Sequence, residues 1–107
     1  MNVVHQELAS GRWQKLSLVE QLANIGSEIE RTIKWRLSQL DYSKLAFNRA
    51  LELLDLSIAD RKNQRRLKEL LRLRETLADY FVFKNQYSSD DASWRKYFFA
   101  YNYAARV

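Results

Sequence analysis

One short segment of the chain, residues 61–72, contains six basic side chains that could bind an anion: Arg61, Lys62, Arg65, Arg66, Lys68 and Arg72. From Arg61 to Arg72, four of them stand at intervals of four, three and four residues, a spacing that aligns them on one face of an α-helix over about 16 Å. Such a stripe can neutralise successive phosphates of a nucleic acid, and each neutralised phosphate releases counterions. We therefore predict a nucleic-acid site here; an acidic protein partner or a purely solvated face are the alternatives.

A second candidate surface lies in the aromatic-rich C-terminal segment. Ten of the 14 aromatic residues fall between Tyr80 and Tyr103, more than one packing face requires. Phe99 and Tyr103 are four residues apart and share one helix face. Tyrosine, phenylalanine and arginine are enriched in protein interfaces, although exposed aromatics can also stack on bases, or the helix can simply pack in the core. The residues predicted to form a partner or oligomer interface are Arg95, Lys96, Phe99, Tyr103 and Arg106.

The residue types needed for catalysis do not come together in this sequence. His5 is the only histidine, and there is no cysteine, Gly-rich phosphate loop or Glu-x-x-His pair. Zinc sites, thiol chemistry and histidine-activated serines are therefore excluded. We expect a protein that is not an enzyme, with no cofactor and no small-molecule substrate. A magnesium site remains open, although solvated helix faces account better for its candidate ligands, which are Glu28, Glu52, Asp55 and Asp79.

Length and composition indicate one domain over residues 1–107. A chain of this size can bury a core without metals or disulfides. The formal net charge of +5, with 11 arginines among 18 basic residues, favours a polyanionic partner. No apolar stretch approaches the roughly 18 residues of a membrane span. A cytoplasmic location and no membrane partner are the expectations.

The elements that must position these residues are helical. The chain has no proline and only two glycines, and it is rich in leucine, alanine, arginine and glutamate. A capping box at Ser17–Glu20 opens a first helix reaching about Leu40. Further helices are predicted over 44–59, from Asn63 to Phe83, and over 92–106. A short helical or irregular segment precedes them. The prediction is an all-α antiparallel four-helix bundle.

Apolar periodicity gives each helix a core face. The face predicted for the third helix consists of Leu67, Leu70, Leu71, Arg74, Leu77, Ala78 and Phe81. Arg36 and Arg74 each interrupt an apolar stripe, so each must find a carboxylate or reach solvent. For Arg74 the candidate partners are Glu30 and Asp55. Structural ion pairs and positions in an oligomer or partner groove both remain open for the two arginines.

Three segments carry a resemblance to known proteins: LANIGSE from Leu22, RALELLDL from Arg49, and the stretch from Tyr97 to Arg106. Together they resemble small prokaryotic all-helical proteins of uncharacterised function, over Glu7 to Arg106. In size, basic charge and helical layout the chain also resembles accessory proteins of diversity-generating retroelements. That resemblance implies an oligomer and a partnership with a reverse transcriptase and its RNA, hence RNA rather than DNA as ligand. It assigns no site residue.

Overall fold

The computed structural model describes residues 11–106, and within them the chain forms four α-helices and no strand. A 3₁₀ turn, η2 (Trp13–Lys15), precedes α1 (Leu18–Trp35) and α2 (Leu40–Ala59). A second 3₁₀ helix, η3 (Arg61–Arg66), leads directly into α3 (Leu67–Phe81), and α4 (Asp91–Arg106) follows a loop. The prediction of an all-α four-helix bundle is confirmed. His5 lies outside the described residues.

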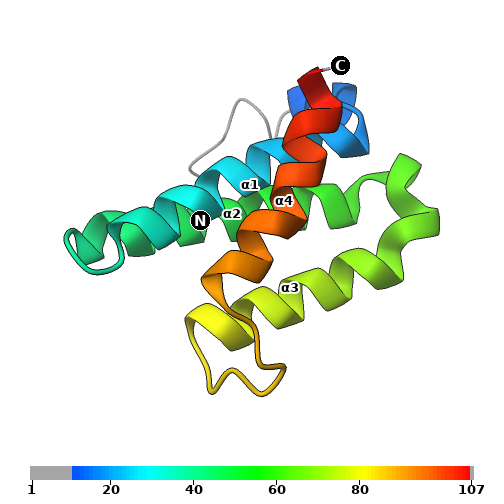
Figure 1. Cartoon of the computed structure of the whole chain (residues 1–107). Coiled ribbons are helices and arrows are strands. Elements are labelled where there is room, and N and C mark those ends of the chain that lie inside the picture. Colours follow the sequence, from blue (N-terminus) through cyan, green and yellow to red (C-terminus); the bar gives the residue numbers. More distant parts are fainter. Residues whose placement is uncertain (1–10, 107) are drawn as a thin grey trace.

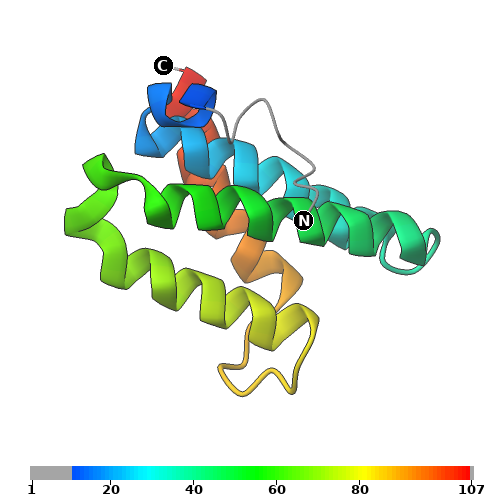
Figure 2. The ribbon, with the colours of Figure 1, turned by 180° about the vertical axis from the view of Figure 1, so that it is seen from behind.

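Helix α1 lies at the centre of the bundle. It runs antiparallel to α2 along one side and is crossed by α4 on another (Figure 1). Seen from behind, α2 lies in front and α4 behind it (Figure 2). Helix α3 turns back along α2 after η3 and packs mainly against α2 and η3. The basic segment 61–72 therefore occupies the corner between α2 and α3 and the first half of α3.

The predicted capping box at the start of α1 is confirmed. The Glu20 amide donates to Ser17 Oγ at 3.1 Å, and the Ser17 amide donates to Glu20 Oε1 at 3.0 Å. The end of the helix was predicted wrongly, because α1 stops at Trp35 and α2 already begins at Leu40. The turn thus spans 36–39 and not 41–43. Ser43 lies within α2, and its buried hydroxyl donates to the Thr32 carbonyl of α1 at 2.7 Å.

The core is drawn from all four helices and from Trp13 of η2. On α3 its face is set by Leu70, Leu73 and Leu77, all buried. The predicted face was wrong in two places. Leu71 is 49% exposed, and Arg74 lies at the margin, paired with Asp55. The buried face is therefore rotated away from these two residues and toward Leu73, which is not part of the predicted face.

Helices α1 and α4 approach each other closely at Gly26. A Cβ atom on Gly26 would lie 2.7 Å from Phe98 Cβ, nearer than real Cβ contacts allow. The missing side chain therefore lets the buried Phe98 ring pack against the α1 backbone.

None of the described helices is both long enough and apolar enough to cross a bilayer.

Candidate nucleic-acid interface

A buried polar network fixes the corner from which the basic segment starts. Gln21 of α1 is fully buried; its amide nitrogen donates to the Trp13 carbonyl at 3.1 Å and to Asp60 Oδ2 at 3.0 Å. Its amide oxygen accepts from Ser57 Oγ and from Asn63 Nδ2, both at 2.9 Å. The Trp13 indole in turn donates to Ser57 Oγ at 2.9 Å. The network ties η2, α1, α2 and η3 together.

Asp60 connects this network to the first cations. It precedes η3, and its Oδ1 accepts from the Lys62 amide at 3.1 Å, which caps the turn. The Lys62 ammonium pairs with Asp60 Oδ2 and donates to the Gln14 carbonyl at 3.0 Å. Burial acts to raise the pKa of Asp60, but hydrogen bonds from Lys62 and Gln21 outweigh it, so this pKa lies below its usual value. Lys62 is thus held by the fold rather than free to meet a ligand.

All six side chains of the predicted nucleic-acid site are exposed, including Arg61 and Lys68. Arg66 is neutralised by Glu69, with hydrogen bonds of 2.6 and 2.9 Å. The Arg72 guanidinium stands 5.4 Å from the centre of the Tyr87 ring. The remaining cations have no acidic partner in the part of the chain that the structure describes; they are Arg61, Arg65, Lys68 and Arg72. We call these four the basic band.

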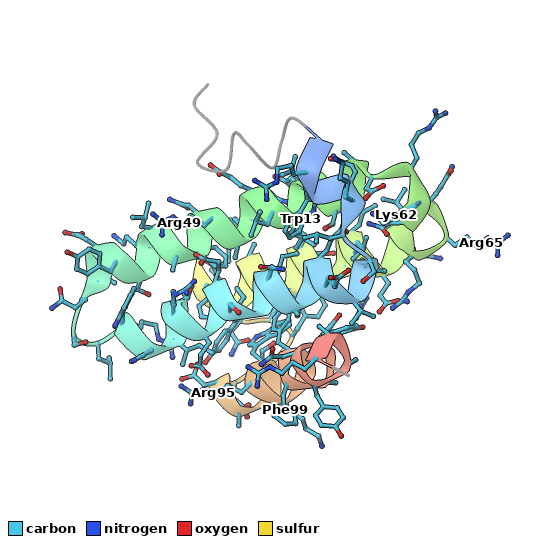
Figure 3. The ribbon with its side chains drawn as sticks, turned by 90° about the horizontal axis from the view of Figure 1, so that it is seen from above. Trp13, Arg49, Lys62, Arg65, Arg95 and Phe99 are labelled. Carbon is cyan, nitrogen blue, oxygen red and sulfur yellow. The ribbon has the colours of Figure 1, made fainter. Side chains whose placement is uncertain are left out.

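The basic band is not the straight stripe that one continuous helix would give. Arg61 and Arg65 lie in a 3₁₀ helix, where residues three apart align, so residues four apart point about 120° from each other. Lys68 and Arg72 lie in α3, where they are one turn apart. Figure 3 shows Arg65 projecting away from the molecule at this corner. The band therefore bends around the corner before following α3.

A groove of about 620 Å³ adjoins the end of the basic band, between α3 and the loop that precedes α4. The loop folds back beneath the C-terminal half of α3 (Figure 1) because the buried Asp79 accepts from the amides of Gln86 at 2.8 Å and Tyr87 at 3.0 Å. The Tyr87 hydroxyl donates to Glu75 Oε1 at 2.8 Å. Sequence reasoning missed this groove. In the sequence, only Asp79 near the end of α3 and Tyr87 in the following loop could have indicated it.

The second predicted surface, on α4, keeps its exposed aromatics. Phe99 is 67% and Tyr103 64% exposed, and their rings stack with centroids 6.3 Å apart. Lys96 and Arg106 are exposed as well. Arg95 is not free, because it forms a bidentate pair with Glu30 of α1, the shortest contact being 3.0 Å. Beside Phe99, a groove of about 410 Å³ runs between α1 and α4. The interface role of these residues stays a prediction.

The two arginines inside apolar stripes both form structural ion pairs. Arg74 pairs with Asp55 of α2 at 2.7 Å, one of its two expected partners. Arg36 leaves the end of α1 to contact the Asp91 carboxylate at 2.7 Å, at the start of α4. Tyr80 donates to the same carboxylate at 2.6 Å. This contact joins the end of α1 to α3 and to the start of α4.

The carboxylates considered as magnesium ligands are distributed over separate sites. Glu28 and Asp79 are buried, so the prediction that they belong to solvated faces was wrong. Glu28 pairs with Arg31, Asp79 holds the loop and Asp55 pairs with Arg74. Within residues 11–106, no three acidic or histidine side chains gather as metal ligands would.

Comparison of the chain with protein-family models, curated proteins and solved structures finds no match.

Proposed function

We propose that this protein is a non-catalytic helical bundle that binds nucleic acid through the basic band. One observation carries the proposal: Arg61, Arg65, Lys68 and Arg72 are exposed and lack an acidic partner within the described chain. Most other arginines on the described surface are paired with a carboxylate, as Arg36, Arg74 and Arg95 are. Exposed cations that follow one path are suited to a line of phosphates.

RNA, rather than DNA, is the ligand in this proposal. The resemblance in size, charge and helical layout to retroelement accessory proteins supports that choice. It also supports a role as accessory subunit to a larger nucleic-acid enzyme such as a reverse transcriptase. A cytoplasmic location fits such a role. An acidic protein is the alternative ligand of the same band. RNA binding whose salt dependence matches the number of cations in the band supports RNA, and failure to bind RNA leaves the acidic protein.

The test is RNA binding by fluorescence anisotropy at several salt concentrations. If four cations meet phosphates of a single strand, log Kd should change with log salt with a slope of magnitude about 3. The double variant Arg65→Glu with Lys68→Glu should roughly halve that slope and weaken binding more than about tenfold at moderate salt. Both side chains are exposed and unpaired in the described chain, so the fold should be retained.

The matched control reverses Lys34 and Lys44, which are exposed at the opposite end of α1 and α2. This double variant has the same formal net charge as the first but leaves the basic band intact. It should bind RNA nearly as the wild type does. Equal losses in the two double variants would mean that net charge alone attracts RNA, and the assignment of the band would be wrong.

A second candidate function is self-association or partner binding through α4. It is favoured by the stacked and exposed Phe99 and Tyr103 beside the groove between α1 and α4. Static light scattering over a range of concentrations should then show an oligomer that Phe99→Ser with Tyr103→Ser converts to a monomer. A monomer at every concentration would remove self-association.

A further inference from the structure

The groove beside α3 combines flat aromatic surfaces with the end of the basic band. Phe83 is 72% exposed and Tyr87 44% exposed, and both line the groove. Arg72 belongs to the basic band, and its guanidinium lies over the Tyr87 ring at 5.4 Å from the centroid. The cation that ends the path for phosphates is therefore in contact with the first aromatic ring of the groove.

We propose that this groove receives unpaired bases, so that the ligand of the basic band is a single-stranded nucleic acid. The inference rests on the proposed function, since it takes the strand along the basic band as given. Proteins that bind single strands combine a basic path for the backbone with aromatic side chains on which bases stack. In a duplex each base face is covered by its neighbours, so Phe83 and Tyr87 would contribute little to duplex binding.

The charges around the groove are of both signs, and the exposed cation that lines it is Lys84. The Asp79 carboxylate is buried beneath backbone amides of the loop, and Arg74 is paired with Asp55. Glu75 is exposed and lines the groove; it accepts from the Tyr87 hydroxyl, a contact that does not cancel its negative charge. Lys84 is exposed and lines the groove as well. A phosphate approaching from Arg72 therefore meets a further cation, while the bases meet the rings.

The two rings are held in different ways, which allows the test to be specific. Tyr87 is fixed by its hydroxyl contact to Glu75 and by its amide contact to Asp79. The Phe83 side chain is exposed and only its amide is fixed, by the Ala78 carbonyl at 3.1 Å. Replacing Phe83 by leucine removes a flat stacking surface and keeps an apolar side chain, and it should disturb the fold little because the ring is mostly exposed. Tyr87→Phe keeps the ring and removes only the hydroxyl.

The experiment measures the Kd of a labelled RNA of about 15 nucleotides without self-complementarity, and of the same RNA annealed to its complement. Phe83→Leu and Tyr87→Leu should each weaken single-strand binding at least about fivefold and leave duplex binding unchanged. Tyr87→Phe should bind the single strand like the wild type. Tyr42→Leu is the matched control: this ring is 57% exposed at the start of α2 and does not line the groove, so its loss should change neither affinity.

Three results would overturn the inference. If both leucine variants bind the single strand normally while Arg65→Glu with Lys68→Glu still weakens it, the bases do not use the groove and the proposed function stands. If single-strand and duplex binding fall together in Phe83→Leu, the ring does not select unpaired bases. If the wild type binds neither RNA, the inference and the proposed function both fail.

Discussion

The Gln21 carboxamide uses its whole hydrogen-bonding capacity inside the protein. Its two N–H groups donate to the Trp13 carbonyl and to Asp60, and its oxygen accepts from Ser57 and Asn63. A glutamine has two donor hydrogens and two acceptor lone pairs, so this fully buried side chain is satisfied. The result is a rigid joint beneath the corner where the basic band begins, because η3 is held through Asp60 and Asn63.

Replacing Gln21 by leucine should therefore be costly although the two side chains are similar in size. The change removes the buried hydrogen bonds of Gln21 to the Trp13 carbonyl, Asp60, Ser57 and Asn63, each with a net contribution of about 0.5–1.5 kcal/mol. Asn63 keeps the Ser57 carbonyl and Asp60 keeps Lys62, so the loss stays below the sum of these contributions. We expect the free energy of unfolding to fall by about 3 kcal/mol in urea titrations. Asn24→Ala, an exposed change on the same helix, should alter it by less than about 0.5 kcal/mol. A loss no larger in Gln21→Leu would contradict the network.

At the scale of helices, the sequence predicts those features that depend only on contacts between neighbouring residues. The capping box of Ser17 and Glu20 needs only neighbouring residues, and it forms as expected. The turn between α1 and α2 depends on distant residues: Arg36 reaches Asp91, and the Ser43 hydroxyl reaches back across the turn to Thr32. Periodicity alone does not contain these contacts. The same applies to α3, whose preceding 3₁₀ helix bends the basic band.

The contact between α1 and α4 gives a prediction at this scale. In an isolated helix Gly→Ala stabilises by about 1 kcal/mol, so Gly26→Ala would be expected to help. Here the new methyl would lie 2.7 Å from Phe98 Cβ and 2.9 Å from its Cγ. Atoms so close to the α4 backbone cannot move aside without shifting the helix, and overpacking of this kind costs roughly 1–3 kcal/mol. The overpacking should outweigh the helix propensity, so that Gly26→Ala lowers the melting temperature.

The neighbouring Ser27 supplies the control for this substitution. It is exposed on the same turn of α1, and its hydroxyl donates to the Ala23 carbonyl of the same helix at 3.3 Å. Ser27→Ala gains helix propensity without meeting α4, so its melting temperature, measured by circular dichroism, should equal or slightly exceed that of the wild type. A Gly26→Ala protein as stable as Ser27→Ala would show that α4 does not press on α1.

Over the whole molecule, the candidate site lies at the margin of the bundle. Helix α1 packs against both α2 and α4, whereas α3 packs mainly on α2 and η3. The identities of the basic residues could be predicted from the sequence because charge and spacing are local. The groove beside α3 could not, since it exists only after Asp79 has folded the loop back and brought Tyr87 to Arg72. The candidate site thus depends on tertiary structure, and most of it lies on α3, a helix at the edge of the bundle.

This arrangement predicts an order of opening that amide hydrogen exchange can resolve. Amides near Leu73 in α3 should exchange faster than those near Ile25 in α1, because α3 can detach while α1 remains packed between two helices. Bound RNA must be released before α3 opens; at an RNA concentration of about 100 times Kd, α3 exchange should slow by about 100-fold. Amides at the C-terminal end of α4, which open without disturbing the basic band, should keep their rates. Slowing confined to α4 would instead place the RNA on the face of Phe99 and Tyr103.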